Sequence, residues 1–195
     1  MSQHIEIEFK NLLKKEEFSR LQTYFKLDGS KFKKQVNHYF DTSSFSLKNA
    51  GSALRIREKG NQYELTLKQP DETGLLETSQ ILSGQEASAA LQHSVFPEGI
   101  IKDSLANMRV DTDSLVFFGS LTTLRAEKEY ENGLIVLDHS YYLNKEDFEL
   151  EYEVTDAIEG LSIFNNLLEE LNIPKRETDN KIKRFYNEKY KQLRN

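Results

Sequence analysis

Charged side chains recur at every second position in three stretches of the chain, and their charges are sorted by sign. The stretches are Glu6-x-Glu8-x-Lys10, Arg55-x-Arg57 and Glu149-x-Glu151-x-Glu153. A β-strand turns alternate side chains to the same face, so neighbours within a stretch lie about 6–7 Å apart on one face. Like charges at that spacing repel each other, and a bound counter-ion relieves the repulsion.

The residue types indicate which counter-ions could bind. Carboxylate oxygens are the preferred ligands of hard divalent cations such as Mg²⁺ and Mn²⁺. Arginine pairs can bind phosphate or carboxylate anions through two parallel hydrogen bonds. Together these stretches suggest a metal–polyphosphate site inside a closed sheet whose apolar faces turn outward. On periodicity alone, an ordinary sheet with one solvated face is the more common explanation.

Strands must position these side chains, because period-two alternation dominates the chain. Residues 3–10 alternate apolar and charged side chains and form the first predicted strand. The other predicted strands span 35–41, 53–59, 62–69, 74–82, 115–119, 121–130, 133–142 and 147–155. Asn132-Gly133 predicts a hairpin turn between two of them, and Lys59-Gly60-Asn61-Gln62 predicts another.

Helical spacing of apolar residues is less frequent. It predicts helices over 14–27, 158–172 and 180–193, with Asp179 or Asn180 as the cap of the last, and it indicates 84–93 and 97–108 more weakly. Eight or nine antiparallel strands with few helices are typical of an α+β domain built on a large sheet or barrel.

The charged stretches resemble motifs of the CYTH superfamily, which comprises class IV adenylyl cyclases, thiamine triphosphatase and other triphosphate tunnel metalloenzymes. The resemblance covers residues 4 to 186 and is to the short, single-domain bacterial type. It is carried by Glu6-Ile7-Glu8-Phe9-Lys10, His38-Tyr39-Phe40-Asp41-Thr42, Leu54-Arg55-Ile56-Arg57, Leu65-Thr66-Leu67-Lys68-Gln69-Pro70, Leu124-Arg125, Val136-Leu137-Asp138, Glu149-Leu150-Glu151-Tyr152-Glu153 and Lys181.

This resemblance implies a fold and a set of site residues. The fold is a closed antiparallel eight-stranded β tunnel with a charged interior, covered by a few helices, within one domain over 1–195. The implied ligands of Mg²⁺ or Mn²⁺ are Glu6, Glu8, Asp138, Glu149 and Glu151, with Glu153 an alternative member of the acidic row. The implied triphosphate-binding residues are Lys10, Arg55, Arg57, Lys68, Arg125 and Lys181, with Lys183 and Arg184 as neighbours that could replace Lys181.

Catalysis is assigned by the same resemblance to Lys10, Glu6 and Glu8, and Glu77 is expected to form a salt bridge with the basic side chains. We expect a metal-dependent triphosphatase, with inorganic triphosphate as the leading substrate. The alternatives are a class IV-type adenylyl cyclase, a thiamine triphosphatase and a non-catalytic module that binds polyphosphate. Production of cyclic AMP from ATP would distinguish the cyclase, and binding without turnover would distinguish the module.

Composition restricts the partners. The 195 residues include 26 basic and 32 acidic side chains, and the net charge of −6 argues against a duplex nucleic-acid binder. The absence of cysteine excludes disulfides, thiolate metal sites and a cysteine nucleophile. No apolar run is long enough for a membrane span, and the first residues lack the pattern of a signal peptide. We therefore expect a cytoplasmic monomer or homodimer that acts on a small molecule.

Overall fold

The computed structural model describes residues 2–72 and 74–194. Its strands are β1 (Ser2–Leu13), β2 (Lys33–Thr42), β3 (Ala53–Lys59), β4 (Gln62–Pro70), β5 (Leu75–Leu82), β6 (Leu115–Tyr130), β7 (Gly133–Tyr142) and β8 (Lys145–Val154). Its α-helices are α1 (Lys15–Phe25), α2 (Ser46–Asn49), α3 (Gly84–His93), α4 (Ile100–Asn107), α5 (Ala157–Glu170) and α6 (Lys181–Arg194).

The eight strands form a closed antiparallel barrel in the order β1-β5-β4-β3-β2-β6-β7-β8. This confirms the predicted α+β fold class with an eight-stranded barrel. The chain also divides into two compact units, which are treated one at a time. Unit 1 contains Gln35–Leu121 with the chain up to Ile5, and unit 2 contains Glu6–Lys34 with the chain from Thr122 onward. A single domain over 1–195 remains a prediction.

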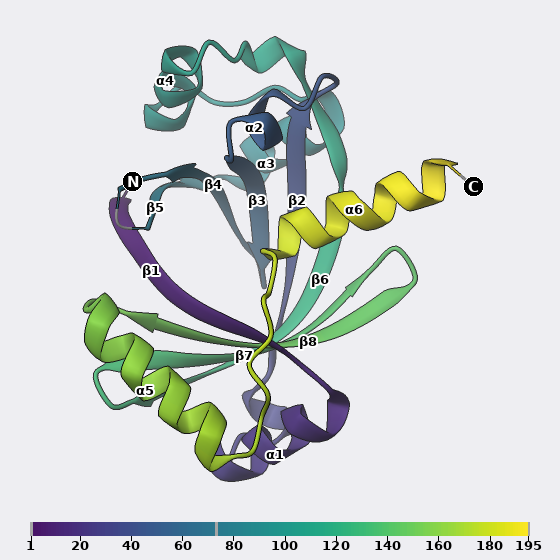
Figure 1. Ribbon diagram of the computed structural model, residues 1–195. Coiled ribbons are helices and arrows are strands. Elements are labelled where there is room, and N and C mark those ends of the chain that lie inside the picture. Colours follow the sequence, from purple (N-terminus) through teal and green to yellow (C-terminus); the bar gives the residue numbers. More distant parts are fainter. Residues whose placement is uncertain (1, 73, 195) are drawn as a thin grey trace. The chain divides into compact units, whose positions relative to one another are not determined.

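In unit 1, helices cover the apolar face of the strands (Figure 1). Leu54 and Ile56 on β3, and Leu65 and Leu67 on β4, are at most 1% exposed and form a core with residues of α2, α3 and α4. Because side chains alternate, the charged residues between them lie on the other face. The helices thus cover the apolar face, and the charged face turns away from them. This is the arrangement that the periodicity suggested.

Asp41, in the motif after His38, has a structural task in unit 1. Its carboxylate accepts hydrogen bonds from the backbone N–H groups of Leu47 (2.9 Å) and Lys48 (3.0 Å) in the short helix α2. These N–H groups lie at the start of the helix and have no partner within it. Asp41 therefore fixes α2, which the sequence analysis did not predict.

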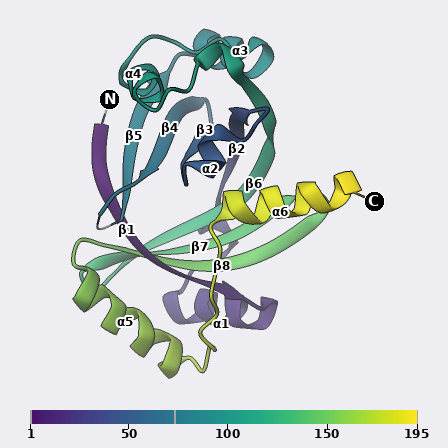
Figure 2. The same ribbon diagram turned by 45° about the horizontal axis from the view of Figure 1, so that its top comes forward.

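Unit 2 is built in the same way. Figures 1 and 2 show α1 and α5 on one side of β7 and β8, and α6 on the other side. Phe18 and Leu21 of α1 and Phe164 of α5 are at most 5% exposed and pack with Leu150 and Tyr152 of β8. The charged residues of β8 lie on the opposite face, the side on which α6 lies.

Two predicted strands and one predicted helix need correction. The strands predicted at 115–119 and 121–130 are one continuous strand, β6, because Gly119 adopts a φ of 149° without ending the strand. The predicted helix 97–108 is shorter: α4 begins only after Gly99, whose φ of 145° is not helical.

Both predicted hairpins are present, and the turn of one of them is shifted by one residue. Lys59 pairs with Gln62, so the predicted turn lies between them. The hairpin turn predicted at Asn132-Gly133 is formed one residue earlier, since Tyr130 pairs with Gly133. Gly133 opens β7 instead, at a place where a Cβ atom would lie 2.6 Å from the carbonyl oxygen of Glu153.

Candidate functional site

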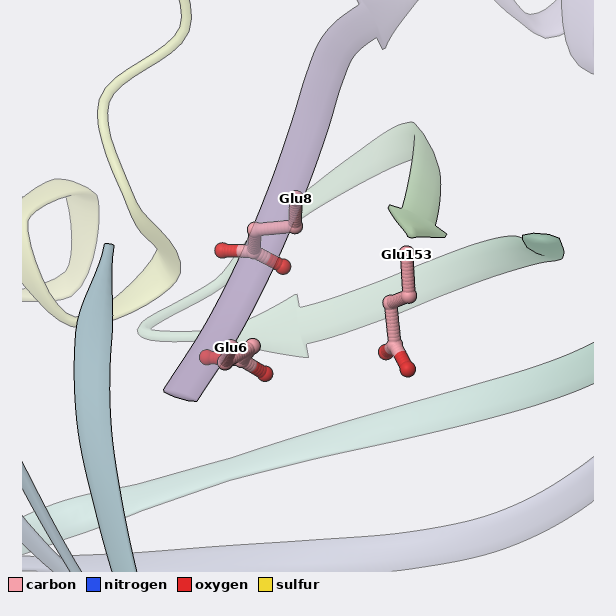
Figure 3. A group of neighbouring side chains, drawn as sticks. All are labelled: Glu6, Glu8 and Glu153. Carbon is pink, nitrogen blue, oxygen red and sulfur yellow. The ribbon is translucent and has the colours of Figure 1, made fainter. Parts of the chain in front are cut away.

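Three carboxylates come together in unit 2, and we call them the acidic cluster. Glu6 and Glu8 lie on β1 and Glu153 lies on β8, and one oxygen of each lies within 4.8 Å of the other two. Figure 3 shows the three side chains. Each is partly exposed to solvent. The cluster therefore offers three oxygen ligands at a place that a cation can reach.

The antiparallel register of β1 and β8 produces this cluster. Glu8 pairs directly with Glu153, and Lys10 pairs with Glu151. Glu6 lies two positions before Glu8, so its side chain is on the same face of β1. The spacing seen in the sequence therefore places both rows on one face, and the strand pairing decides which members meet.

The protonation of Glu153 reflects its surroundings. Burial raises the pKa of its carboxyl group, and the negative charges of Glu151, Glu6 and Glu8 raise it further, against the opposing effect of Arg125. A divalent cation would offset this concentration of negative charge and favour the ionised form. The acidic cluster is therefore electrostatically suited to a cation.

Lys10 is bonded to the acidic cluster through Glu8, with which it forms an ion pair. Burial disfavours the charged ammonium group, but the carboxylates of Glu8, Glu151 and Glu149 outweigh it and raise the pKa of Lys10. Lys10 therefore keeps its positive charge at neutral pH.

A second group of charges in unit 2 surrounds Lys181, the first residue of α6. The Lys181 ammonium lies 2.8 Å from Asp138 and 2.9 Å from Glu149, and it also contacts Glu151. Arg125 donates two hydrogen bonds to Asp138, of 2.8 and 2.6 Å, and one of 2.7 Å to Glu151. We call these five residues the ion-pair group.

Strand pairing assembles the ion-pair group as well. Arg125 on β6 pairs with Asp138 on β7, which pairs with Glu149 on β8. Asp138 and Glu149 are fully buried. Burial disfavours the ionised form of Glu151, but Lys181, Arg125 and Lys10 hold the pKa of Glu151 well below its usual value. Ion pairing therefore keeps the Glu151 carboxylate charged inside the protein.

Glu149 has a further partner in α6. Arg184 donates a hydrogen bond of 2.5 Å to Glu149 Oε2 and another of 3.1 Å to Asp147. The other oxygen of Glu149, Oε1, is buried and has no hydrogen-bond partner among the described residues. One oxygen of this buried carboxylate therefore keeps its capacity to accept a hydrogen bond or to bind a cation.

The structure distributes the predicted metal ligands over both groups. Glu6 and Glu8 lie in the acidic cluster with Glu153, the alternative member of the acidic row. Asp138, Glu149 and Glu151 lie in the ion-pair group around Lys181. All of them offer carboxylate oxygens. Whether each binds a metal remains a prediction.

The predicted C-terminal basic residue can be compared with its neighbours. Lys181 contacts three carboxylates, and its side chain is 12% exposed. Arg184 binds Glu149 and is 10% exposed. Lys183 is 58% exposed and forms an ion pair with Asp179. Lys181 and Arg184 thus both bind buried carboxylates, while Lys183 is the most exposed of the three side chains. Which of them binds triphosphate remains a prediction.

Unit 1 carries the basic residues, which we call the basic group: Arg55, Arg57 and Lys68. Lys68 on β4 pairs in register with Glu77 on β5, and their charged atoms lie 3.0 Å apart. Arg55 lies 3.9 Å from the same carboxylate, and Arg57 donates a 3.3 Å hydrogen bond to Asn37. The predicted salt bridge of Glu77 with the basic residues is confirmed.

The charge on Glu77 is strongly stabilised. Burial disfavours its ionised form, but Lys68, Arg55 and Arg57 lower the pKa of Glu77 to about 2. The carboxylate therefore stays ionised over the physiological pH range. An anionic ligand of the basic group must accordingly bind in the presence of this negative charge.

The acidic cluster fits a divalent metal ion by its chemistry and its dimensions. Mg²⁺ binds oxygen ligands at about 2.0–2.1 Å, so two ligands on opposite sides lie about 4 Å apart. The ligand oxygens of Glu6, Glu8 and Glu153 lie within 4.8 Å of one another, which is close to that spacing. The buried Oε1 of Glu149 is a further oxygen of the same type.

Comparison with known sequences supports one family. The family model described as "CYTH domain" matches residues 4–186. A Bacillus subtilis (strain 168) protein, YjbK, is 56% identical over 193 residues, which cover 99% of this chain and 100% of that protein. YjbK is named as a proposed triphosphatase.

Comparison with solved structures gives the same result. A Bacillus halodurans protein described as a proposed adenylate cyclase has a TM-score of 0.93 and 46% identity, covering 95% of this chain and 100% of that one. HpAC1 from Hippeastrum, a proposed adenylyl cyclase described with a dominant triphosphatase activity, has a TM-score of 0.81 and 23% identity, covering 94% and 96% of the two chains. The second likeness supports the fold alone.

The helices of the described chain were also compared with the dimensions of a bilayer. None of them is both long enough and apolar enough to span a membrane.

Proposed function

The chain belongs to the CYTH domain family, and from that premise we propose that it is a divalent-metal-dependent triphosphatase. It hydrolyses a phosphoanhydride bond of a linear triphosphate, and inorganic triphosphate is its preferred substrate. The sorting of charge carries this proposal: the acidic cluster offers three oxygens within 4.8 Å, while Arg55, Arg57 and Lys68 lie on the adjacent strands β3 and β4.

The basic group binds phosphate oxygens. Triphosphate carries about four to five negative charges at neutral pH, and a protein with a net charge of −6 can bind it only where positive charge is concentrated. Arginine side chains can donate two parallel hydrogen bonds to one phosphate group. Arg55 and Arg57 share one face of β3, so they address neighbouring phosphate oxygens. A bare triphosphate offers no base or sugar, which makes these contacts the main source of recognition.

The acidic cluster holds the metal. Glu6, Glu8 and Glu153 are the proposed ligands, and a Mg²⁺ or Mn²⁺ ion bound there supplies Lewis-acid polarisation of phosphate oxygens. Carboxylates suit these hard cations better than histidine or thiolate ligands do. The ion-pair group contributes less to metal binding, because Lys181, Arg125 and Arg184 already balance its carboxylates.

Lys10 stabilises charge in the transition state. Its raised pKa keeps the ammonium group protonated at neutral pH, so it does not serve as a general base. As a fixed positive charge beside Glu8, it can interact with the phosphoryl group as charge develops on the transferred and leaving oxygens. We therefore propose charge stabilisation, and not proton abstraction from the attacking water, as the task of Lys10.

The experiment that tests this function separates products. The protein is incubated with inorganic triphosphate, ATP and thiamine triphosphate, each with Mg²⁺ and with Mn²⁺, and the phosphate species and cyclic AMP are resolved chromatographically. We expect phosphate and diphosphate from inorganic triphosphate, and no turnover after EDTA. Cyclic AMP with diphosphate from ATP would establish a cyclase instead. Binding of triphosphate without turnover under either metal would leave only a binding module.

A further inference from the structure

The segment between α5 and α6, residues 174–180, is bonded to β1 by one buried side chain. We call this segment the strap. Asn11 is fully buried and donates a 3.1 Å hydrogen bond from Nδ2 to the carbonyl oxygen of Pro174. Its Oδ1 accepts a 2.6 Å hydrogen bond from the backbone N–H of Arg176. Both ends of a single amide group therefore satisfy the backbone of the strap.

The next residue of β1 continues this pairing. The N–H of Leu12 donates a 2.9 Å hydrogen bond to the hydroxyl of Thr178. The Arg176 side chain donates a 2.7 Å hydrogen bond to the carbonyl oxygen of Leu12. The strap therefore runs along β1 with bonds at two consecutive residues. Because buried backbone groups need partners, these bonds favour one position of the strap over others.

Arg176 also joins the strap to the start of α1. Its guanidinium group donates hydrogen bonds of 2.8 Å to each carboxylate oxygen of Glu17. Glu17 in turn accepts a 2.7 Å hydrogen bond from the backbone of Lys14, the N-cap residue of α1. A bidentate arginine–carboxylate pair has a defined orientation. The strap is therefore held at a second place, independent of Asn11.

Where the strap ends, α6 begins. The side chain of Asn180 accepts a 2.9 Å hydrogen bond from the backbone of Lys183 and so caps the first turn. Lys181 is the first residue of that turn. Thr178, which is bonded to β1, lies only three residues before Lys181. The position of the strap therefore determines where the Lys181 ammonium group can reach.

Asn11 directly follows Lys10, and the alternation of a strand turns their side chains to opposite faces. Lys10 is thus on the charged face, where its carboxylate neighbours include Glu151, and Asn11 is on the face that the strap covers. Lys181 contacts the same Glu151 from α6. β1 therefore carries Lys10 itself. Through the bonds of Asn11 to the strap, it also fixes the position from which Lys181 reaches Glu151.

We propose that Asn11 is a positioning residue, which holds the strap so that Lys181 reaches the carboxylates of β7 and β8. This inference rests on the proposed function and extends it with the expectation, implied by the family resemblance, that Lys181 takes part in triphosphate binding. Three carboxylates surround Lys181, so a displacement of about 1 Å disturbs several contacts at once. Misplacement on that scale can reduce catalysis by about 100-fold.

The test uses Asn11→Asp in the full-length protein. Aspartate has nearly the same shape and keeps an acceptor for the N–H of Arg176, but it sets a carboxylate oxygen against the carbonyl oxygen of Pro174. The matched control is Asn49→Asp, which alters an exposed asparagine bonded to the carbonyl oxygen of Ser44 in unit 1. Thr178→Val is a second test variant, which removes the hydroxyl that accepts from the Leu12 N–H and donates to the carbonyl oxygen of Arg176.

The first measurement is hydrogen exchange of the backbone amides of residues 182–191, without substrate or metal. We expect about 10-fold faster exchange in Asn11→Asp, a smaller increase in Thr178→Val, and no change in Asn49→Asp. Unchanged exchange in both strap variants would overturn the positioning role whatever the enzymatic activity, so this readout is independent of the proposed function. If Asn11→Asp does not fold, Thr178→Val decides the question.

The second measurement is triphosphate hydrolysis, combined with Lys181→Ala. If Asn11 acts through Lys181, Asn11→Asp lowers kcat/KM by about 10- to 100-fold and changes kcat and KM in the same proportion as Lys181→Ala does. The double variant then shows little loss beyond Lys181→Ala alone. Fully multiplied losses in the double variant would overturn the inference. Absence of triphosphate hydrolysis in the unaltered protein would reject the proposed function and leave the exchange result to decide the strap.

Discussion

Glu8 on β1 and Glu153 on β8 are direct partners in the antiparallel register, so two carboxylates face each other across a pair of strands. Like charges directly opposite destabilise a sheet. Glu6 lies on the same face and adds a third negative charge within 4.8 Å. Stability is therefore reduced at this place when no cation is bound, which is expected of a binding site and not of a purely structural strand pair.

The first prediction is that Glu153→Gln stabilises the metal-free protein and weakens its response to metal. Removing one charge of the facing pair should raise the free energy of unfolding by about 0.2–1 kcal/mol. Mg²⁺ or Mn²⁺ should raise the melting temperature of the unaltered protein, because a ligand that binds only the folded state stabilises it. The variant should show a smaller rise.

The control for this prediction is Glu98→Gln, which removes a carboxylate that is 84% exposed and lies in unit 1. Melting curves are recorded in EDTA and across a metal titration. An equal metal-induced rise in the Glu153→Gln variant and the unaltered protein would exclude Glu153 as a ligand. If metal raises the melting temperature of none of the three proteins, the acidic cluster is not a metal site.

The second prediction concerns Lys10 and has two effects of opposite sign. Lys10→Met removes the positive charge paired with Glu8, so the cluster becomes more negative and should bind Mn²⁺ more tightly. Turnover of triphosphate should fall by at least about 100-fold, because a charge that stabilises the transition state is lost. Calorimetric titration with Mn²⁺ and phosphate-release assays measure the two effects.

Lys10→Arg is the matched variant, since it keeps the charge and changes its geometry. It should leave the affinity for Mn²⁺ nearly unchanged and retain part of the turnover. Weaker Mn²⁺ binding in Lys10→Met would show that Lys10 organises the cluster instead of opposing the cation.

Much of the fold follows from local patterns. Alternation alone predicted β3 at 53–59 and β7 at 133–142 with the observed ends, because one face of each strand packs on helices while the other is charged. The same alternation placed all the charged rows on a shared face of their strands. Residues 115–130 were predicted as two strands, since a glycine within a long strand often marks a break, but β6 continues through Gly119.

Strand register could not be predicted in this way. Glu149, Glu151 and Glu153 share one face of β8, so a shift of two residues leaves the pattern of alternation unchanged. The choice of Glu153 as the partner of Glu8 depends on how β1 and β8 pair. The bonds of Asn11 to the strap likewise join residues more than 160 positions apart, and no periodic signal marks such contacts.

The third prediction concerns the pH dependence of stability through Glu77. Its pKa is lowered from 4.5 to about 2 in the folded protein. A depressed pKa contributes stability above the unfolded value of 4.5, and this contribution is lost as the pH falls toward 2. The side chain is 9% exposed, and the shift corresponds to about 3 kcal/mol.

Urea unfolding of the unaltered protein and of Glu77→Gln, from pH 7 to pH 2, measures this contribution. Because other carboxylates titrate in both proteins, the difference between them isolates Glu77. We expect Glu77→Gln to be less stable at pH 7, with the two free energies converging near pH 2. A difference that stays constant with pH would show that packing, not charge, accounts for the effect of the substitution.

The fourth prediction concerns Arg57 and the substrate. If Arg57 donates two hydrogen bonds to a phosphate group, Arg57→Ala should reduce kcat/KM for triphosphate by about 30- to 1,000-fold, equivalent to about 2–4 kcal/mol. Arg57→Lys should restore only part of this loss, because lysine keeps the charge but not the planar pair of donors. Lys128→Ala, which removes an exposed charge on β6, should have no effect.

The two Arg57 variants are most informative when they are assayed with both inorganic triphosphate and ATP. With inorganic triphosphate, all recognition comes from charged contacts, so the losses should be large and should appear in the assay for phosphate release. With ATP, the unaltered protein should already be slower, because the nucleoside adds bulk for which no binding site is proposed. Equal activity of Arg57→Lys and the unaltered protein would mean that Arg57 acts as a simple positive charge. Unimpaired triphosphate cleavage by Arg57→Ala would remove Arg57 from the binding residues, and the basic group would then reduce to Arg55 and Lys68.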